Sequence, residues 1–461
     1  MVYGTAVEPG QELPSIAVAP PGPRSRELGA RMAAVESPAF DARRQARAAR
    51  SGEDQGPIVY AAGRGANVFD VDGNRYVDLT AGFGALLLGH PPNAATDAAR
   101  AATDELVLAL GDVYASELKV RACEAIAGLF PEPGARVMLG LSGADAVTCA
   151  LKTALLATGK PGVVAFEGSY HGLSYGPLAA LGFAPAFREP FAPHLGVPVT
   201  FAPYPSSAGE LGASLSAVRA ALADGSAGAI LVEPILGRGG AVVPPPSFLP
   251  ELRALADEAS ALLVADEIWT GMGRTGALLA SAPVTPDVLC LGKGLGGGVP
   301  ISACVGRAAV MDAWGGHGGT RIHTGTHFGS PPACAAALAT LETIRARDLP
   351  ARAREVGDAW RAELGAACAG RATVRGAGLM VGVELADASE ALAVSRELLA
   401  RGFIVLTGGA RGDVLTLSPP LTIEPALLGA FTSTLAELLA TRRGGLTGPS
   451  SGASAGERPA R

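Results

Sequence analysis

Short apolar runs alternate steadily with longer amphipathic stretches along most of this 461-residue chain. Such alternation is typical of βαβ units on a mostly parallel sheet flanked by helices. Residues 145–158 and 248–260 show helical spacing of Ala and Leu. The pattern predicts an α/β fold whose ligands bind beyond the carboxyl ends of the strands. The candidate strands are residues 136–140, 163–167, 199–202, 229–233, 262–266 and 288–291.

Both ends of the chain lack this pattern. Residues 1–26 are rich in Pro, Gly and Ala, and residues 444–461 are rich in Gly, Ser and Pro. Segments of such composition bury little apolar surface, so we expect two disordered tails.

The segments that flank the core predict a second, smaller domain. Residues 66–80 alternate apolar and polar side chains around the turn Asp72-Gly73, as a β-hairpin does. Helices and a strand pair follow towards the end of the chain. We expect a large domain over residues 91–333 and a smaller α+β domain built from residues 27–90 and 334–443.

Charge and hydropathy narrow the classes of partner. The formal charge is -6 and the arginines are scattered among acidic residues, which is not the footprint of a nucleic-acid-binding protein. No uninterrupted apolar stretch reaches membrane-spanning length, and the start MVYGTAVEPGQELPSIAVAPPGP has no basic region followed by an apolar core. We expect a cytoplasmic protein that binds neither nucleic acid nor a membrane.

We expect no metal site. The six cysteines lie far apart without CxxC pairs, which favours buried thiols. His323 and His327 are four residues apart, but Gly325 between them argues against the helix that would aim both at one metal ion.

Lysine is scarce, and arginine supplies nearly all of the positive charge. Lys293 lies in the glycine-rich segment VLCLGKGLGGGVP, directly after a candidate strand, and Asp266 ends the candidate strand before it. Lysine is rare in this chain, and this one lies in a segment without other charged residues. We therefore expect Lys293 to have a chemical role. The four lysines are Lys119, Lys152, Lys160 and Lys293.

A lysine beside a carboxylate in a dry crevice is what pyridoxal 5'-phosphate needs. The aldehyde of this cofactor forms an imine with an amine, and a carboxylate keeps the pyridine nitrogen protonated so that the ring withdraws electrons. Lysine can act as nucleophile and then as proton carrier because burial readily lowers its pKa. The alternative is that Asp266 only caps a loop and that Lys293 is solvated.

The motifs LVADEIWTGMGRTG and GKGLGGGVP, preceded in order by SGADAV, SYHG and VEP, resemble the class III pyridoxal-phosphate aminotransferases. This family includes ornithine, 4-aminobutyrate and ω-amino acid transaminases, and the likeness runs over about residues 57–440. It implies the PLP-dependent transferase fold of type I. It also implies a ping-pong transfer of an amino group from an amine or amino acid to a keto acid.

The resemblance implies a role for each residue of these motifs. Lys293 would form the imine and move the proton, and Asp266 would pair with the pyridine nitrogen. Tyr170 would stack on one face of the ring and Ile268 on the other. The other cofactor contacts that it implies are Ser142, Gly143, Ala144, His171, Glu233 and Thr326.

Two of these contacts would bind the phosphate in different ways. Gly143 and Ala144 would donate backbone N–H groups at a helix start, where the dipole favours an anion. Thr326 would reach the phosphate from the neighbouring subunit, which implies a homodimer.

Several of these residues have simpler alternatives. Tyr170 could be an ordinary core aromatic. Ser142 and Thr326 could be turn residues whose hydroxyls cap the local backbone. Nothing else in the sequence points a substrate at His171, so we expect a structural role for it.

Three positions depart from the family and bear on the substrate. Trp269 replaces a Gln that often binds the ring oxygen of the cofactor, and Thr416 replaces an Arg that grips an α-carboxylate. Arg238 replaces the Glu that gates that Arg, so we expect Arg238 or Arg411 to bind the carboxylate of the substrate. The alternative is that Arg238 points to solvent and the donor has no carboxylate. The substrate-binding candidates are Trp269, Arg238, Arg411 and Phe83.

Other functions remain open from the sequence. A PLP-dependent isomerase, either an aminomutase or a racemase, would use the same lysine and aspartate but return the nitrogen to its own substrate. A catalytically silent binding protein is disfavoured because Lys293 and Asp266 are retained. A nicotinamide-dependent dehydrogenase is disfavoured because no GxGxxG follows an early strand.

Overall fold

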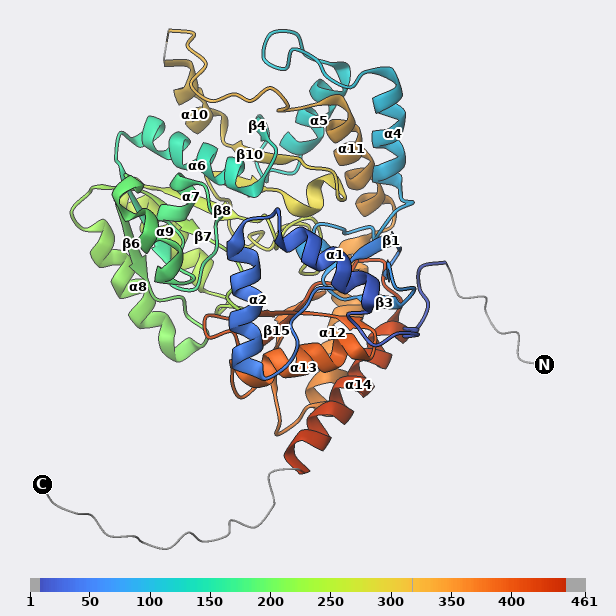
Figure 1. The fold of residues 1–461 in the computed structure, drawn as a ribbon. Helices are drawn as coiled ribbons and strands as arrows, with labels where there is room; N and C mark the ends of the chain where they lie inside the picture. Colours follow the sequence, from blue (N-terminus) through green and yellow to red (C-terminus); the bar gives the residue numbers. More distant parts are fainter. Residues whose placement is uncertain (1–8, 317, 445–461) are drawn as a thin grey trace, which may run out of the picture.

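The computed structural model describes residues 9–316 and 318–444, and its centre is a seven-stranded sheet with the strand order β4-β10-β9-β8-β7-β5-β6 (Figure 1). Strand β10 pairs antiparallel with β4 and β9, whereas the pairs from β9 to β6 are parallel. The predicted mostly parallel sheet is therefore confirmed. The strands are β4 Arg136–Gly140, β5 Gly162–Phe166, β6 Val199–Ala202, β7 Ala227–Val232, β8 Leu262–Asp266, β9 Val288–Leu291 and β10 Ser302–Gly306.

Helices cover both faces of this sheet, which explains why strands such as β7 are buried along their whole length. The longer helices have the amphipathic spacing that the sequence shows. The α-helices of this part are α4 Ala94–Glu105, α5 Glu117–Ala127, α6 Gly143–Thr158, α7 Tyr175–Ala179, α8 Ala208–Leu222, α9 Phe248–Ala259, α10 Ala308–Met311 and α11 Pro331–Ala346. Its short 3-10 helices are η1 Pro185–Phe187, η2 Glu189–His194, η3 Lys293–Gly296 and η4 Asp312–Gly316.

The second domain brings the two ends of the chain together. Strand β13 pairs in parallel with β3, so a C-terminal strand extends the sheet that begins with the N-terminal hairpin. In Figure 1 the blue N-terminal elements and the orange helices α12 and α13 lie on the same side of the large sheet. Its N-terminal elements are α1 Pro23–Ala33, α2 Pro38–Ser51, β1 Tyr60–Arg64, β2 Asn67–Asp70, β3 Arg75–Asp78 and α3 Ala81–Gly84. Its C-terminal elements are α12 Leu349–Ala367, β11 Thr373–Ala377, β12 Met380–Glu384, α13 Ala388–Ala400, β13 Phe403–Ile404, β14 Leu406–Gly408, β15 Val414–Leu417 and α14 Pro425–Gly444.

The expected boundary between residues 333 and 334 falls inside helix α11, which packs against α4 and α5 of the large domain. Helix α11 begins at Pro331, a residue suited to the first turn of a helix. The chain therefore enters the second domain after this helix rather than before it.

The expectation of a disordered tail over residues 1–26 is wrong for its described part. Ser15 pairs with Arg75 of β3 through two backbone hydrogen bonds of 2.9 Å. The side chain of Asn74 accepts the N–H groups of Ala17 and Val18. Polar anchors of this kind leave no apolar pattern in the sequence. Residues 1–8 and 445–461 lie outside the described residues.

None of the helices in the described ranges is long and apolar enough to cross a membrane.

Candidate active site

The predicted cofactor residues converge at the carboxyl ends of the central strands. Asp266 is the last residue of β8, and Lys293 follows β9, the neighbouring strand. Glu233 follows β7, and the segment with Tyr170 follows β5. Because parallel strands end at one edge of the sheet, these side chains come close although they are far apart in sequence.

Asp266 has a partner that the sequence did not reveal. Its Oδ2 lies 2.7 Å from Nδ1 of His171, and its Oδ1 accepts the N–H of Ile268. Burial opposes the protonated imidazole, but the hydrogen bond and charge of Asp266, together with the charge of Glu233, raise the pKa of His171. His171 therefore contacts the carboxylate of Asp266 directly, which agrees with a structural role but gives it a partner that the sequence did not identify.

Lys293 is held in a strained and poorly solvated position. Its φ of 41° lies in the left-handed region, which is unfavourable for a residue with a side chain. Burial lowers its pKa to about 8, although the charges of Glu233 and Asp266 act in the opposite direction. Nζ lies 3.7 Å from the ring centroid of Trp269. Roughly a tenth of this lysine is therefore neutral and nucleophilic at pH 7, far more than for a lysine with the ordinary pKa of 10.5.

Glu233 holds two backbone segments around the site. Its Oε1 accepts the N–H of Tyr170 at 2.7 Å, and its Oε2 accepts the N–H of Gly237 at 2.9 Å. Burial raises its pKa to about 7. These contacts fix the position of the Tyr170 ring and of the loop that carries Arg238.

The start of helix α6 offers free donors beside this edge of the sheet. Ser142 caps the helix by accepting the N–H of Asp145, whose side chain accepts the N–H of Ser142 in return. No hydrogen bond to the N–H of Gly143 or Ala144 is found among the described residues. Ser142 thus has the local capping role that its simpler alternative describes, while its two neighbours present amides suited to an anion.

Ile268 packs where the predicted phosphate and lysine segments meet. A Cβ placed on Gly143 would lie 2.8 Å from Cδ1 of Ile268, and one on Gly292 would lie 3.4 Å from its Cγ2. Gly143 is therefore needed for Ile268 to lie against the helix start, whereas a Cβ on Gly292 would only touch it.

Trp269 occupies a slot made by two glycines. A Cβ on Gly84 would lie 2.4 Å from Nε1 of Trp269, and a Cβ on Gly237 would lie 2.4 Å from its Cε3. The buried Nε1 has no hydrogen-bond partner within the described chain. The sequence predicted a substrate-facing Trp269 but gave no sign of these two glycines.

The two candidate arginines differ in their surroundings. The guanidinium of Arg238 lies 4.5 Å from the ring centroid of Tyr170 and 4.9 Å from that of Phe183. Arg411 instead pairs with Glu384 and Asp413, and its side chain is 74% exposed. Of the two, only Arg238 lies beside the ring of Tyr170.

Two predicted residues are exposed in the single chain. Phe83 is 61% exposed and lies in a left-handed run next to Gly84, which adjoins Trp269. Thr326 is exposed, and no hydrogen bond links it to the phosphate-binding candidates within the described residues. The chain alone does not bring Thr326 to the site.

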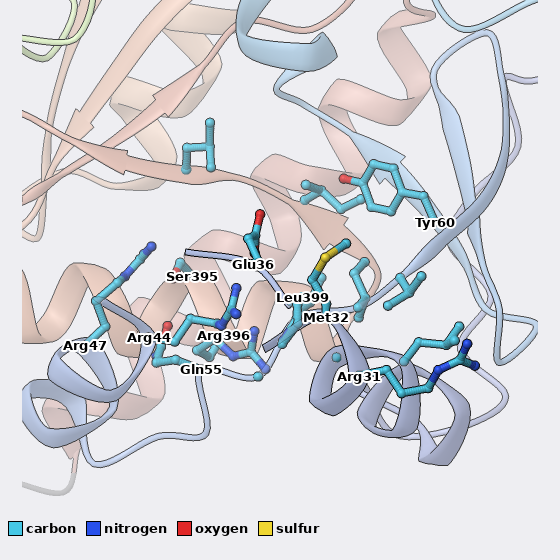
Figure 2. Close-up of a pocket in the computed structure, with 18 of the residues that line it drawn as sticks. Arg31, Met32, Glu36, Arg44, Arg47, Gln55, Tyr60, Ser395, Arg396 and Leu399 are labelled. Atoms are coloured by element: carbon cyan, nitrogen blue, oxygen red, sulfur yellow. The ribbon is translucent and has the colours of Figure 1, made fainter. Parts of the chain in front are cut away.

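The second domain contains a pocket of about 950 Å³ between helices α1, α2 and α13 (Figure 2). Met32 and Leu399 lie between Tyr60 on one side and the arginines Arg44 and Arg396 on the other. None of the predicted cofactor or substrate residues lines this pocket. Its size therefore does not mark the catalytic site.

Comparison with known proteins decides the family. The sequence profile described as aminotransferase class-III matches residues 48–439. This chain belongs to the class III aminotransferases. These enzymes depend on pyridoxal phosphate, and the aminotransferase therefore carries out PLP-dependent transamination rather than the isomerisation that the sequence alone left open.

Relatives and solved structures agree with this assignment. The aminotransferase is 39% identical to the acetylornithine aminotransferase of Methanopyrus kandleri, over 83% of its own length and 94% of that protein. It is also 39% identical to that of Mycolicibacterium smegmatis, over 84% and 94%. The ornithine aminotransferase structure from Toxoplasma gondii superposes with a TM-score of 0.76 at 30% identity, covering 84% of this chain and 92% of that one. A PLP-bound amine transaminase from an uncultivated Pseudomonas species has a TM-score of 0.76 at 29% identity, covering 84% and 95%.

The residues present fit this cofactor. A lysine of lowered pKa can bind its aldehyde, a buried carboxylate backed by His171 can pair with its pyridine nitrogen, and free amides at the start of α6 can bind its phosphate. Each of these groups is supplied by a different strand end of the sheet.

Proposed function

We propose that Lys293 and Asp266 are the catalytic residues of this aminotransferase. The observation that supports this most strongly is their placement at the ends of adjacent parallel strands, with His171 hydrogen-bonded behind Asp266. The bound cofactor supplies an electron sink for the carbon that carries the amine. Nζ of Lys293 would hold the cofactor at rest, and during the reaction it would accept and return the proton of that carbon.

The remaining cofactor residues are part of the same proposal. Tyr170 and Ile268 enclose the ring, and the N–H groups of Gly143 and Ala144 bind the phosphate. Glu233 acts as a positioning residue through the backbone of Tyr170.

Arg238, rather than Arg411, is the residue that we propose binds a carboxylate of the substrate. Arg411 is already paired with two carboxylates, whereas Arg238 has no acidic partner among the described residues and lies against Tyr170. The relatives to which this chain is similar are named acetylornithine aminotransferases, and this name describes enzymes that act on an amine. We therefore propose a donor that carries a primary amine and a remote anionic group, and a keto acid whose carboxylate binds Arg238 in the second half of the reaction.

Single-turnover spectroscopy tests the proposed activity. The PLP-loaded enzyme is mixed with a panel of amines without any keto acid. We expect some amine that carries an anionic group to convert the visible cofactor band to the spectrum of the aminated cofactor, and a keto acid to restore it. Failure of every amine and keto acid in the panel would contradict the proposal. In Arg238→Leu, an unchanged Michaelis constant for all keto acids would remove Arg238 from the site.

We also propose that the enzyme is a homodimer in which Thr326 of each protomer serves the site of its partner. The exposure of Thr326 in the single chain supports this, as do the exposed apolar side chains of residues 106–114. Mixed dimers test it. Lys293→Ala paired with Thr326→Ala should regain one intact site, whereas wild type paired with the double variant should not.

A cytoplasmic location completes the proposal. All six cysteines of the chain are free in the structure, which is the usual state in a reducing compartment. The small-molecule partners are an amine and a keto acid.

A further inference from the structure

A second pocket, of about 470 Å³, is lined by Arg238, whose guanidinium lies over the ring of Tyr170. Its other walls are helix α2, the aromatic side chains of Phe183 and Phe187, the start of α13, and residues 407–412 at the end of β14 and in the loop after it. None of its lining residues is acidic. Its basic lining residues are Arg43, Arg47, Arg50, Arg238 and Arg411.

Four of these arginines have no carboxylate partner in the part of the chain that the structure describes. Arg411 is neutralised by Glu384 and Asp413. Arg47 donates only to the hydroxyl of Thr407, at 3.1 Å. Arg43 and Arg50 form no ion pair among the described residues, and neither does Arg238. Arg43 and Arg50 are exposed, whereas Arg47 and Arg238 are half-buried. The lack of a carboxylate partner is unusual for the latter two, because most other buried or half-buried arginines of the described chain bind a carboxylate or backbone carbonyls.

The guanidinium groups are close enough to repel one another. Burial lowers the pKa of Arg47, and the charges of Arg43, Arg396 and Arg50 lower it further. Burial also lowers the pKa of Arg238, with a further contribution from Arg43. An anion that entered the pocket would relieve this repulsion, since several fixed positive charges with no counter-charge favour it.

Arg238 connects this pocket with the proposed catalytic site. Its guanidinium stacks on Tyr170, and its carbonyl oxygen accepts the N–H of Gly409 in the loop that closes the pocket. A substrate that reacts beside Tyr170 can therefore extend past Arg238 towards helix α2.

We propose that this pocket binds a doubly charged oxyanion, of the phosphate class, at the end of the substrate remote from the reacting amine. Arg43 and Arg47 would bind it together with Arg238. The half-buried Arg47 and Arg238, with Arg43 at the rim, carry more positive charge than a single carboxylate neutralises, and arginine matches phosphate oxygens in two-point geometry. This inference rests on the proposed aminotransferase function and names a substrate class for it.

The test compares three sets of donors on the PLP-loaded enzyme: unbranched amino alcohols, aminoalkyl carboxylates and aminoalkyl phosphates of two to six carbons. We expect kcat/KM for the best phosphate to exceed that of its alcohol by roughly tenfold to a hundredfold, the range expected of hydrogen bonds to charged groups. The double variant Arg43→Gln/Arg47→Gln should remove most of this ratio.

Arg44→Gln is the matched control. Arg44 lies on the same helix but pairs with Asp41 and lines the pocket of Figure 2, not the pocket beside Tyr170. The ratio of phosphate to alcohol should persist in this variant.

The outcomes separate the two proposals. If none of the donors, charged or uncharged, converts the cofactor, the proposed function itself fails. If alcohols react as well as phosphates, or if Arg43→Gln/Arg47→Gln leaves the ratio intact, the pocket does not bind the substrate while the aminotransferase function stands. A preference for carboxylates equal to that for phosphates would contradict a doubly charged group.

Discussion

Nδ1 of His171 lies 2.7 Å from Oδ2 of Asp266, and both side chains are buried. Asp266 ends strand β8 and His171 follows strand β5, so this pair joins two strands that are not neighbours in the sheet. The hydrogen bond and charge of Asp266 raise the pKa of His171, so this imidazole can face the carboxylate as a cation in a dry site. His171 therefore positions Asp266 and stabilises the charge that we propose the cofactor nitrogen needs.

Replacing His171 with Ala should weaken PLP binding. Hydrogen bonds to charged groups contribute about 1.5–3 kcal/mol, so we expect roughly a tenfold to hundredfold rise in the dissociation constant of PLP, measured by absorbance titration of the apoenzyme. His171→Asn, which can place an amide N–H towards Asp266, should recover part of the loss. Equal affinities for Ala, Asn and wild type would show that the pair has no role in cofactor binding.

PLP capture by the apoenzyme should depend on pH through Lys293. Only the neutral amine reacts, and its pKa is lowered to about 8. The rate of PLP incorporation, followed by stopped-flow absorbance, should therefore rise with pH and level off above this value. A rate that keeps rising towards 10.5, the pKa of an unburied lysine, would contradict the lowered pKa.

Glu233→Gln should move that pH midpoint downwards. Burial lowers the pKa of Lys293, whereas the charge of Glu233 raises it. Without the charge of Glu233, the pKa of Lys293 should therefore fall further. The amide oxygen of Gln can still accept the N–H of Tyr170, which limits structural change. Glu258→Gln, which removes a surface carboxylate paired with Arg219, should leave the midpoint in place. A midpoint that shifts upwards in Glu233→Gln would contradict the electrostatic explanation.

Gly237→Ala should displace the indole of Trp269. The added Cβ would lie 2.4 Å from Cε3, and overpacking of this kind costs about 1–3 kcal/mol. Urea unfolding should show this loss, and the second substitution Trp269→Leu should recover much of it. Gly212→Ala in helix α8, where nothing lies within 4 Å of the added Cβ, should cause no loss. If the two glycine variants are equally stable, Trp269 does not fill the slot.

The sequence predicted the parts of this structure that depend on local patterns. Strands β4, β6, β8 and β9 have the predicted limits because each is a short, mainly apolar run followed by a turn or a polar segment. The same pattern placed Asp266 at the end of one candidate strand and Lys293 directly after the next, and the fold shows that these strands are neighbours. Strand β10 escaped prediction because its small residues carry no clear strand signal.

What the sequence did not predict depends on contacts between distant segments. Gly84 and Gly237 come from different domains, and only the fold shows that both adjoin Trp269. The contact between His171 and Asp266 likewise joins two segments that are distant in sequence. Arg43, Arg47 and Arg50 recur at helical spacing on α2, and this pattern was the sequence signal for the proposed anion pocket. The signal is weak because solvated helix faces commonly carry such charges.

The most direct test of the account is the absorption spectrum of Lys293→Ala after incubation with PLP. In the wild type we expect a visible band from the lysine-bound cofactor, and in the variant we expect this band to be absent while far-UV circular dichroism shows a folded protein. Loss of the band in the folded variant is the result that the account predicts. A variant that still shows the band and still transfers amino groups would contradict the assignment of Lys293 as the catalytic lysine.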